Sequence, residues 1–247
     1  MITYINEKAI IEPSEVSCDF SLDGIDTAVT AFSDFIFDVF REKYKAVKIG
    51  EISGGAGYAV YRAEVRGKRV AVYKSSVGAP AAAAAMEEIG AVGIKNFVAF
   101  GICGALVTVP PRTFIVPNRA FRDEGTSYHY LPPSDSIEIK NSGVVARSLE
   151  RSGISVMTGA TWTTDGFYRE TRTRAEQMKS NGCVAVDMEC AALQAVCDYR
   201  KKNFYTFFIS ADSLAGEKWE PNYILDPNVT SVEQAAVAAA AALASEL

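Results

Sequence analysis

The sequence predicts an α/β protein with three α/β/α layers around a central mixed, mostly parallel sheet, formed by a single domain over residues 1–247. Short apolar, β-branched segments alternate with helical patterns along the chain. Such alternation is typical of a largely parallel sheet covered by helices on both faces. The composition, with 49% hydrophobic and 22% charged residues, supplies a substantial core. No linker, repeat or low-complexity tract divides the chain.

The expected elements follow one another in chain order. An amphipathic helix is predicted at 25–42, and an alanine-rich helix at 80–89 begins with a proline and is followed by Gly90. Further helices are predicted at 142–152 and 170–180, and another follows Glu189. The predicted strands are 69–73, 97–100, 113–116, 154–158, 184–186 and 203–209, and the strand at 97–100 is expected to end in a glycine turn at 101–104.

Two segments near these elements are less regular. Residues 117–138 form the longest irregular stretch and contain a polar and aromatic cluster at 122–130. Long loops in compact domains are often functional, although a surface Ω-loop or a subunit contact fits this stretch equally well. The C-terminal alanine-rich run starts with the capping box Thr230-x-x-Glu233, which predicts a helix packed on the body of the protein.

Charge and composition exclude several classes of function. The net charge of −5 leaves no basic surplus for phosphate groups, so no nucleic acid is expected as a partner. No apolar run is long enough to span a membrane, and no signal peptide is expected. The five cysteines are odd in number and lie mostly in apolar contexts, which predicts reduced thiols in a cytoplasmic protein. With His129 as the only histidine and no Cys-x-x-Cys, no metal site is expected.

Acidic residues follow a short buried strand near residue 186. Asp187 and Glu189 come directly after the apolar segment 183–186, and a helical pattern begins at once. Ligands of open α/β sheets bind at the carboxyl ends of the strands, where a carboxylate serves a ligand more often than packing. The competing interpretation is that both residues only cap the helix and favour its dipole.

The order of several motifs gives the chain a family resemblance. These are GKRVAVY at 67–73, VGAP at 77–80, AFGICGAL at 99–106, RDEGTSYHY at 122–130, TDGFYRET at 164–171 and VDMECAAL at 186–193. From about Gly67 to Leu247 the chain resembles the nucleoside phosphorylase family, which includes bacterial purine nucleoside phosphorylase, uridine phosphorylase and the adenosylhomocysteine nucleosidases. The resemblance implies a three-layer α/β/α fold and cleavage of an N-glycosidic bond.

The resemblance also implies roles at the sugar. Glu189 matches the glutamate that holds the ribose hydroxyls, and Met188 matches the methionine on the ribose face. A carboxylate at the hydroxyls stabilises the positive charge that grows on the sugar as the C–N bond breaks.

On the base side, Phe167 matches the aromatic residue that stacks on the base, with Tyr168 beside it. Asp212 matches the acid that protonates or hydrogen-bonds the leaving base in purine-cleaving members. Cys103 and Gly104 are expected to line the substrate site. Without the resemblance, Phe167 would be interpreted as a core residue and Asp212 as a turn residue.

The phosphate-binding residues of the family are missing. The place of the Gly-Asp-Pro-x-Arg segment is assigned to residues 11–16, which contain no arginine, and Ala99 and Ile102 replace an arginine and a serine or threonine. In the resembled family a neighbouring subunit also lends an arginine. Its position would fall in the glycine-rich turn 54–57, which contains no arginine. Guanidinium groups are the natural grip on a phosphate dianion. The remaining phosphate-binding candidates are Lys74, Ser75 and Gly101.

Three functions therefore remain open for a nucleoside substrate. One is a phosphorylase, with inorganic phosphate as co-substrate and no other cofactor. The second is a hydrolase in which Glu12 or Glu15 activates water, and the third is a nucleoside-binding protein without turnover. Thr171 and Thr173 stand where uridine-specific members carry a glutamine and an arginine, which favours purines.

A homo-oligomer, dimer or hexamer, is expected because the active sites of the resembled family borrow residues from a neighbouring subunit. Tyr4 and the loop with His129 are the positions that would be lent.

Overall fold

The computed structural model describes residues 4–16, 20–52, 57–224 and 230–247. The strands are β1 Thr27–Ala31, β2 Val47–Ile52, β3 Tyr58–Val65, β4 Lys68–Lys74, β5 Asn96–Ala105, β6 Phe114–Asp123, β7 Ser136–Glu138, β8 Val156–Thr164, β9 Cys183–Asp187 and β10 Asn203–Ser213. The α-helices are α1 Asp34–Lys43, α2 Ala79–Ala91, α3 Ser127–Tyr130, α4 Ser142–Arg151, α5 Arg172–Ser180, α6 Cys190–Tyr199 and α7 Ser231–Glu246. Two short 3-10 helices are η1 Pro13–Glu15 and η2 Phe167–Arg169.

All of these strands join one mixed sheet in the order β10-β6-β8-β9-β5-β1-β4-β3-β2, with β7 paired to β6. Strand β10 also pairs with β5, so that β5, β10, β6, β8 and β9 close into a ring at one end of the sheet. Within the described chain, antiparallel strand pairs are as frequent as parallel ones, so the sheet is more mixed than expected.

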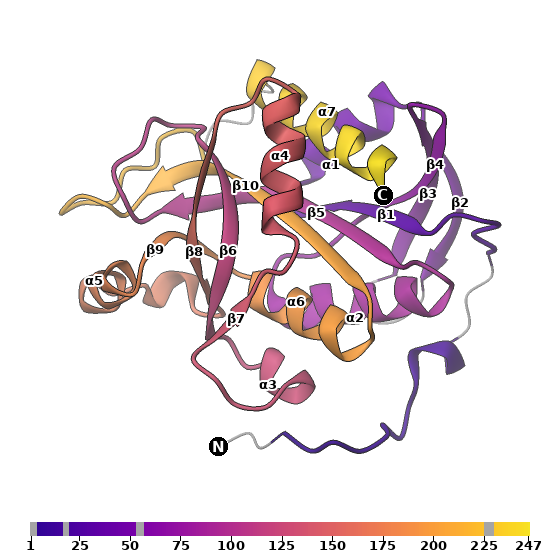
Figure 1. The fold of residues 1–247 in the computed structure, drawn as a ribbon, viewed down its shortest axis with the longest axis horizontal. Coiled ribbons are helices and arrows are strands. Elements are labelled where there is room, and N and C mark those ends of the chain that lie inside the picture. Colours follow the sequence, from indigo (N-terminus) through magenta and orange to yellow (C-terminus); the bar gives the residue numbers. More distant parts are fainter. Residues whose placement is uncertain (1–3, 17–19, 53–56, 225–229) are drawn as a thin grey trace.

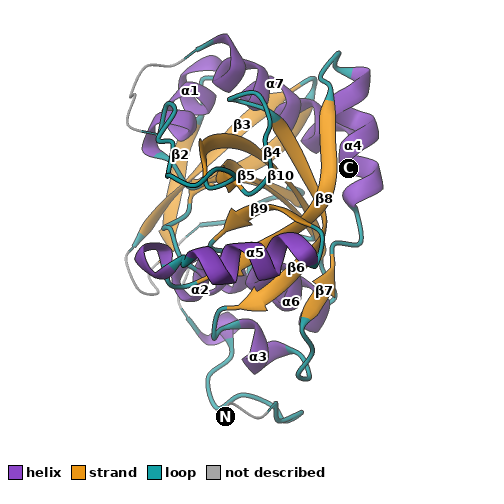
Figure 2. Ribbon diagram, turned by 90° about the vertical axis from the view of Figure 1, so that its left-hand side faces the viewer, coloured by secondary structure: helices purple, strands orange, loops and turns teal. Residues whose placement is uncertain are grey.

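Helices cover both faces of the sheet, as the three-layer prediction requires. Helices α1, α4 and α7 lie on one side and α2 and α6 on the other (Figures 1 and 2). Each side has its own hydrophobic core, one around Phe40, Phe207 and Leu243 and the other around Met86, Phe97 and Leu193. The α/β class is therefore confirmed.

The predicted helix at 25–42 is wrong in its first half. Residues Thr27–Ala31 form β1, and the helix α1 begins only at Asp34. Every residue of β1 is buried because the strand lies between β4 and β5. A strand buried on both faces lacks the polar alternation that marks a strand in a sequence.

The glycine turn predicted at 101–104 is also wrong, since these residues continue β5. The stretch 117–138 is less irregular than expected and contains most of β6, the helix α3 and the strand β7. The helices predicted at 80–89, 142–152 and 170–180 are confirmed as α2, α4 and α5, although α5 begins two residues late. Each of the six predicted strands corresponds to part of an observed strand.

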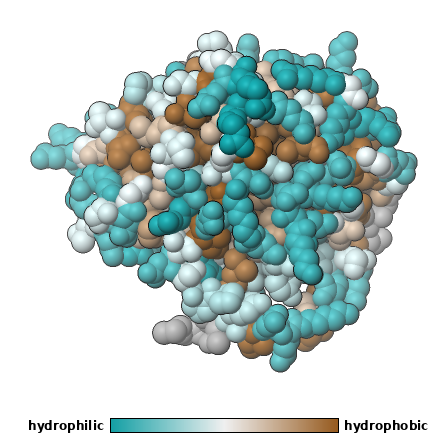
Figure 3. Space-filling view, viewed as in Figure 1, coloured by the Kyte–Doolittle hydropathy of each residue, from teal (hydrophilic) through white to brown (hydrophobic). Residues whose placement is uncertain are grey.

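The surface seen in Figure 3 is mostly hydrophilic, with hydrophobic side chains in scattered patches. None of the helices within the described ranges is long and apolar enough to cross a membrane. The four described cysteines, Cys103, Cys183, Cys190 and Cys197, are buried free thiols, as expected, while Cys18 lies outside the described residues.

The capping box of α7 gives a test of local stability. Thr230 Oγ1 accepts a hydrogen bond from Val232 N at 3.2 Å, and Glu233 accepts one from Thr230 N at 2.8 Å. We expect Thr230→Ala to lower the free energy of unfolding by about 1 kcal/mol, or the melting temperature by about 2–4 °C, in thermal denaturation followed by circular dichroism. Ser231→Ala, at the exposed first position of the helix, is the control and should change stability by less than about 0.5 kcal/mol. Equal effects of the two substitutions would contradict the capping role.

Candidate active site

A cavity of about 350 Å³ lies where β5, β9 and β10 end. Its walls come from segments far apart in the sequence. They are Phe32, Ser33, Val77, Ile102, Cys103, Gly104, Phe167, Glu170, Val186, Asp187, Met188, Glu189, Phe208, Asp212, Leu214 and Ile224. Sheet ends of this kind are the usual ligand sites of α/β folds.

Asp187 is the structural anchor of this region. Its Oδ1 accepts hydrogen bonds from Glu189 N at 2.8 Å and Cys190 N at 2.7 Å, and its Oδ2 accepts from Thr161 Oγ1 and Thr163 Oγ1. Burial raises the pKa of Asp187, and the four hydrogen bonds oppose this shift. For Asp187, the interpretation as a cap of the following helix is therefore correct.

Glu189 does not cap the helix that it precedes. Its carboxylate lines the cavity, and Oε1 accepts a hydrogen bond from Gly78 N at 2.6 Å, at the start of α2. Gly78 has φ 102°, a conformation that favours glycine. Burial and the charge of Asp187 raise the pKa of Glu189 to about 8. A buried carboxyl that faces a cavity without a cationic partner points to a ligand rather than to packing.

Asp212 lies within strand β10 and not in a turn. The pairing of β10 with β5 shifts register between Ser210 and Asp212, and such bulges re-aim side chains. Asp212 pairs in register with Gly104, which has no room for a side chain. A Cβ added to Gly104 would lie 2.8 Å from Val186, 2.9 Å from Leu214 and 3.3 Å from Asp212 Oδ1. Trp219 Nε1 donates to Asp212 Oδ2 at 2.7 Å, and burial raises the pKa of Asp212.

An adjoining cavity of about 470 Å³ extends the site outward past Asp212. It is lined by Phe167, Tyr168, Glu170, Asp212, Leu214, Trp219 and Ile224. The Phe167 side chain is 40% exposed and Tyr168 is 92% exposed, so the interpretation of Phe167 as a core residue is wrong. Their ring centroids lie 4.8 Å apart. Exposed aromatic rings beside a cavity offer a surface for a flat ligand.

Glu170 lines both cavities and was not among the predicted site residues. Burial and the charge of Asp212 raise the pKa of Glu170 to about 7. The sequence shows that Glu170 follows Phe167 by three residues, which was the only signal for a place near the site. Its neighbour Asp212, however, is brought to it only by the fold.

The structure brings together most of the predicted site residues and leaves out the phosphate candidates. Glu189, Met188, Phe167 and Asp212 share the cavity with Cys103 and Gly104, and Tyr168 lines its outer part.

Lys74, Ser75 and Gly101 do not line either cavity. Lys74 Nζ instead pairs with Asp34 at 2.7 Å, and the hydroxyl of the buried Ser75 donates to the carbonyl of Ser76.

The loop after β1, rather than residues 11–16, borders the cavity. It contributes Phe32 and Ser33, and Ile102 comes from β5. Gly54 and Gly55 of the turn expected near phosphate lie outside the described residues. Throughout the described chain, no lysine, arginine or histidine lines the cavity or its outer part, whereas four carboxyl groups do.

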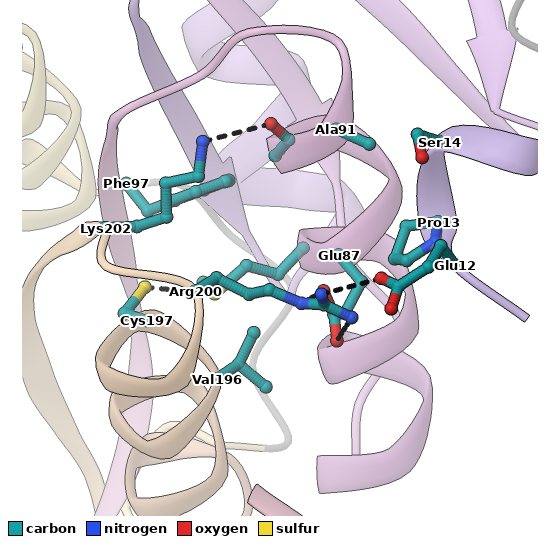
Figure 4. A pocket seen from close by; sticks show the side chains of 12 residues that line it. Glu12, Pro13, Ser14, Glu87, Ala91, Phe97, Val196, Cys197, Arg200 and Lys202 are labelled. Atoms are coloured by element: carbon teal, nitrogen blue, oxygen red, sulfur yellow. Dashed lines mark hydrogen bonds and ion pairs between the residues drawn. The ribbon is translucent and has the colours of Figure 1, made fainter. Parts of the chain in front are cut away.

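Glu12 belongs to a different cavity, of about 200 Å³, between η1, α2 and the end of α6 (Figure 4). There Arg200 donates to Glu12 at 2.8 Å and to Glu87 at 2.6 Å. The expectation that Glu12 or Glu15 activates water at the site therefore finds no support in the geometry. Tyr4 and His129 also lie outside the candidate active site. In the described residues, no group of side chains could hold a metal ion.

The fold is that of an α/β protein, and the cavity at its strand ends is lined by four carboxyl groups. The family model of the phosphorylase superfamily matches residues 26–247. Purine nucleoside phosphorylases of DeoD type from Bacillus cereus, Bacillus thuringiensis and Bacillus mycoides are each 29% identical over 165 residues, covering 63% of this chain and 70% of theirs.

The chain therefore belongs to the phosphorylase superfamily, as a member of its nucleoside phosphorylase family. Its named relatives are enzymes of the pentosyltransferase type. The match begins about forty residues before the region that carried the resemblance in the sequence, so it includes β1 and the loop with Phe32 and Ser33.

The raised pKa of Glu189 predicts how stability depends on pH. The ordinary glutamate value is 4.5, and the value in the folded protein is about 8, so the folded state holds the proton more tightly. This contribution to stability is present below pH 4.5 and is lost as the pH rises to about 8. In thermal melts, Glu189→Gln should reduce the fall in melting temperature between about pH 5 and 8.5, while the exposed control Glu176→Gln should not. An unchanged profile in Glu189→Gln would contradict the raised pKa.

Proposed function

We propose that the chain cleaves the N-glycosidic bond of a nucleoside, with purines favoured over uridine and little use of phosphate. The observation that carries this proposal is the arrangement of the cavity. Glu189 lies at its inner part, Asp212 and Glu170 lie beside the exposed ring of Phe167, and no cationic side chain of the described residues lines it. Membership of the nucleoside phosphorylase family supports the reaction class.

Glu189 serves the sugar in this proposal. Gly78 N donates a hydrogen bond to Glu189 Oε1, and the carboxyl group borders the cavity, where it would meet the ribose hydroxyls. As the C–N bond breaks, the sugar acquires oxocarbenium character. The ionised form of Glu189, whose population grows as the pH approaches its pKa of about 8, stabilises that charge more than it stabilises the ground state. Met188 borders the same region with an adaptable, polarisable side chain.

Asp212 serves the leaving base. The bonding electron pair of the C–N bond goes to the base nitrogen. A proton from the carboxyl group of Asp212 then neutralises the base. The sugar carbon then accepts an oxygen nucleophile. Water yields free sugar after losing a proton, whereas phosphate would yield the sugar 1-phosphate.

The charge of the cavity favours water over phosphate. A phosphate dianion entering it would meet the carboxyl groups of Glu170, Asp187, Glu189 and Asp212, with no guanidinium or ammonium group among the described lining residues. Each missing charge-assisted hydrogen bond is typically worth about 1.5–3 kcal/mol. Several such losses move a micromolar site beyond physiological concentrations.

Product analysis tests this directly. Inosine, adenosine and uridine are incubated with the protein, with and without phosphate at about 10 mM, which would occupy even a millimolar site, and the sugar product is identified by chromatography. We expect cleavage of the purine nucleosides to free ribose, with less than about twofold stimulation by phosphate. Phosphate-dependent release of ribose 1-phosphate would contradict the weak phosphate site, and no cleavage of any nucleoside would contradict the proposed reaction.

Substitution of Glu189 separates catalysis from folding. Glu189→Ala removes the transition-state contact, so kcat/KM should fall by about 10²–10³-fold. The melting temperature at about pH 7 should change little or rise, because a buried carboxyl without a cationic partner is lost. Glu217 is exposed and lines neither part of the cavity, so the control Glu217→Gln should keep full activity. A variant that unfolds while its folded fraction keeps full activity would identify Glu189 as structural.

A homo-oligomer, dimer or hexamer, and a cytoplasmic location belong to the same proposal. Tyr4 and His129 do not line the cavity of their own chain, which is consistent with a role towards a neighbouring copy.

A further inference from the structure

The outer part of the cavity has an unusual set of polar groups. They are the carboxyl groups of Glu170 and Asp212, the exposed hydroxyl of Tyr168 and the indole N–H of Trp219. The indole N–H already donates to Asp212 at 2.7 Å. The groups left for a ligand beside Phe167 are therefore mainly hydrogen-bond acceptors.

No structural interaction explains why the carboxyl group of Glu170 is half-buried. Within the described chain it makes no hydrogen bond and no ion pair, although its side chain is half-buried. The arginines that follow it are engaged elsewhere: Arg172 donates to the carbonyl of Leu214, and Arg174 pairs with Asp123 at 2.7 Å. A half-buried carboxyl without a partner is costly unless a ligand completes it.

The position of Glu170 defines which part of a ligand it meets. It follows the short helix that carries Phe167 and Tyr168, and it faces the same cavity as Asp212 on β10. A base stacked on Phe167 presents its edge to these two carboxyl groups. An amino group on that edge would donate to a carboxylate, whereas a carbonyl oxygen would meet it with like partial charge.

We propose that Glu170 determines base specificity by selecting nucleobases with an exocyclic amino group over those with a carbonyl oxygen at the same position. This inference rests on the proposed function for its substrate class. It adds a selection rule that membership of the family does not supply. Selection acts through repulsion of the carbonyl as well as through attraction of the amino group.

Adenosine and inosine are the matched pair for the test, since they differ only in the amino or oxo group of the base. The assays are run at about pH 8, because only the ionised carboxyl rejects a carbonyl and the pKa of Glu170 is about 7. We expect the wild-type ratio of kcat/KM for adenosine over inosine to be at least about tenfold. Glu170→Gln should lower the ratio about tenfold, because the amide can also donate to a carbonyl.

Glu170→Ala should lower the same ratio by removing both attraction and repulsion. Glu176→Gln, an exposed carboxylate on the neighbouring helix α5, removes the same charge and should leave the ratio within about twofold. Circular dichroism confirms that each variant is folded. A ratio that stays within about twofold of wild type in both Glu170 variants, or a wild-type preference for inosine, overturns the inference.

Binding of free bases separates this inference from the proposed reaction. Calorimetry measures adenine and hypoxanthine with wild type and Glu170→Gln at the same pH. Tighter binding of adenine that is lost in Glu170→Gln supports the selection rule even if no nucleoside is cleaved. Equal binding of both bases, or no binding of either at millimolar concentration, overturns it.

Discussion

The hydrogen bonds accepted by Asp187 are the constraint on which the site depends. One buried carboxylate joins the end of β9 to β8 through two threonine hydroxyls and closes the first turn of α6 through two amide groups. The chain must then turn at Met188 and Glu189, and this turn delivers the Glu189 carboxylate to the cavity. Gly78 N, at the start of α2, donates a hydrogen bond to this carboxylate. The position of Glu189 therefore depends on both α2 and α6, the helices of one layer.

Burying two carboxyl groups next to each other changes what the cavity can bind. The charge of Asp187 contributes to the raised pKa of Glu189, and that of Asp212 to the raised pKa of Glu170. An entering dianion would raise these pKa values further and would find no cation among the described lining residues. The electrostatics of this cavity therefore disfavour an anionic ligand.

The sequence predicted the layers and several of the residues that line the cavity, and its errors have physical causes. Helices α4 and α7 have clear periodicity or caps and were predicted within one residue at their N-termini. Strand β1 is buried on both faces and was taken for the start of a helix. Strands β2 and β3 were missed. Glu170 was missed because Asp212, whose charge it meets in the cavity, is distant in the sequence and close only in the fold.

In the proposed reaction, the outer carboxyl groups of Glu170 and Asp212 would supply the proton that the leaving base needs near neutral pH. His129, the only histidine, lies outside the cavity, and an isolated aspartate of ordinary pKa holds almost no proton at about pH 7. Two carboxyl groups in one half-buried cavity repel each other, so the pair retains a proton that a lone carboxylate would lose. Burial and the charge of Asp212 raise the pKa of Glu170 to about 7, so about half of the molecules hold that proton at pH 7. In the proposed reaction Glu170 would therefore act as an acid in the molecules that hold its proton near neutral pH, and it would select the base where it is ionised, at about pH 8.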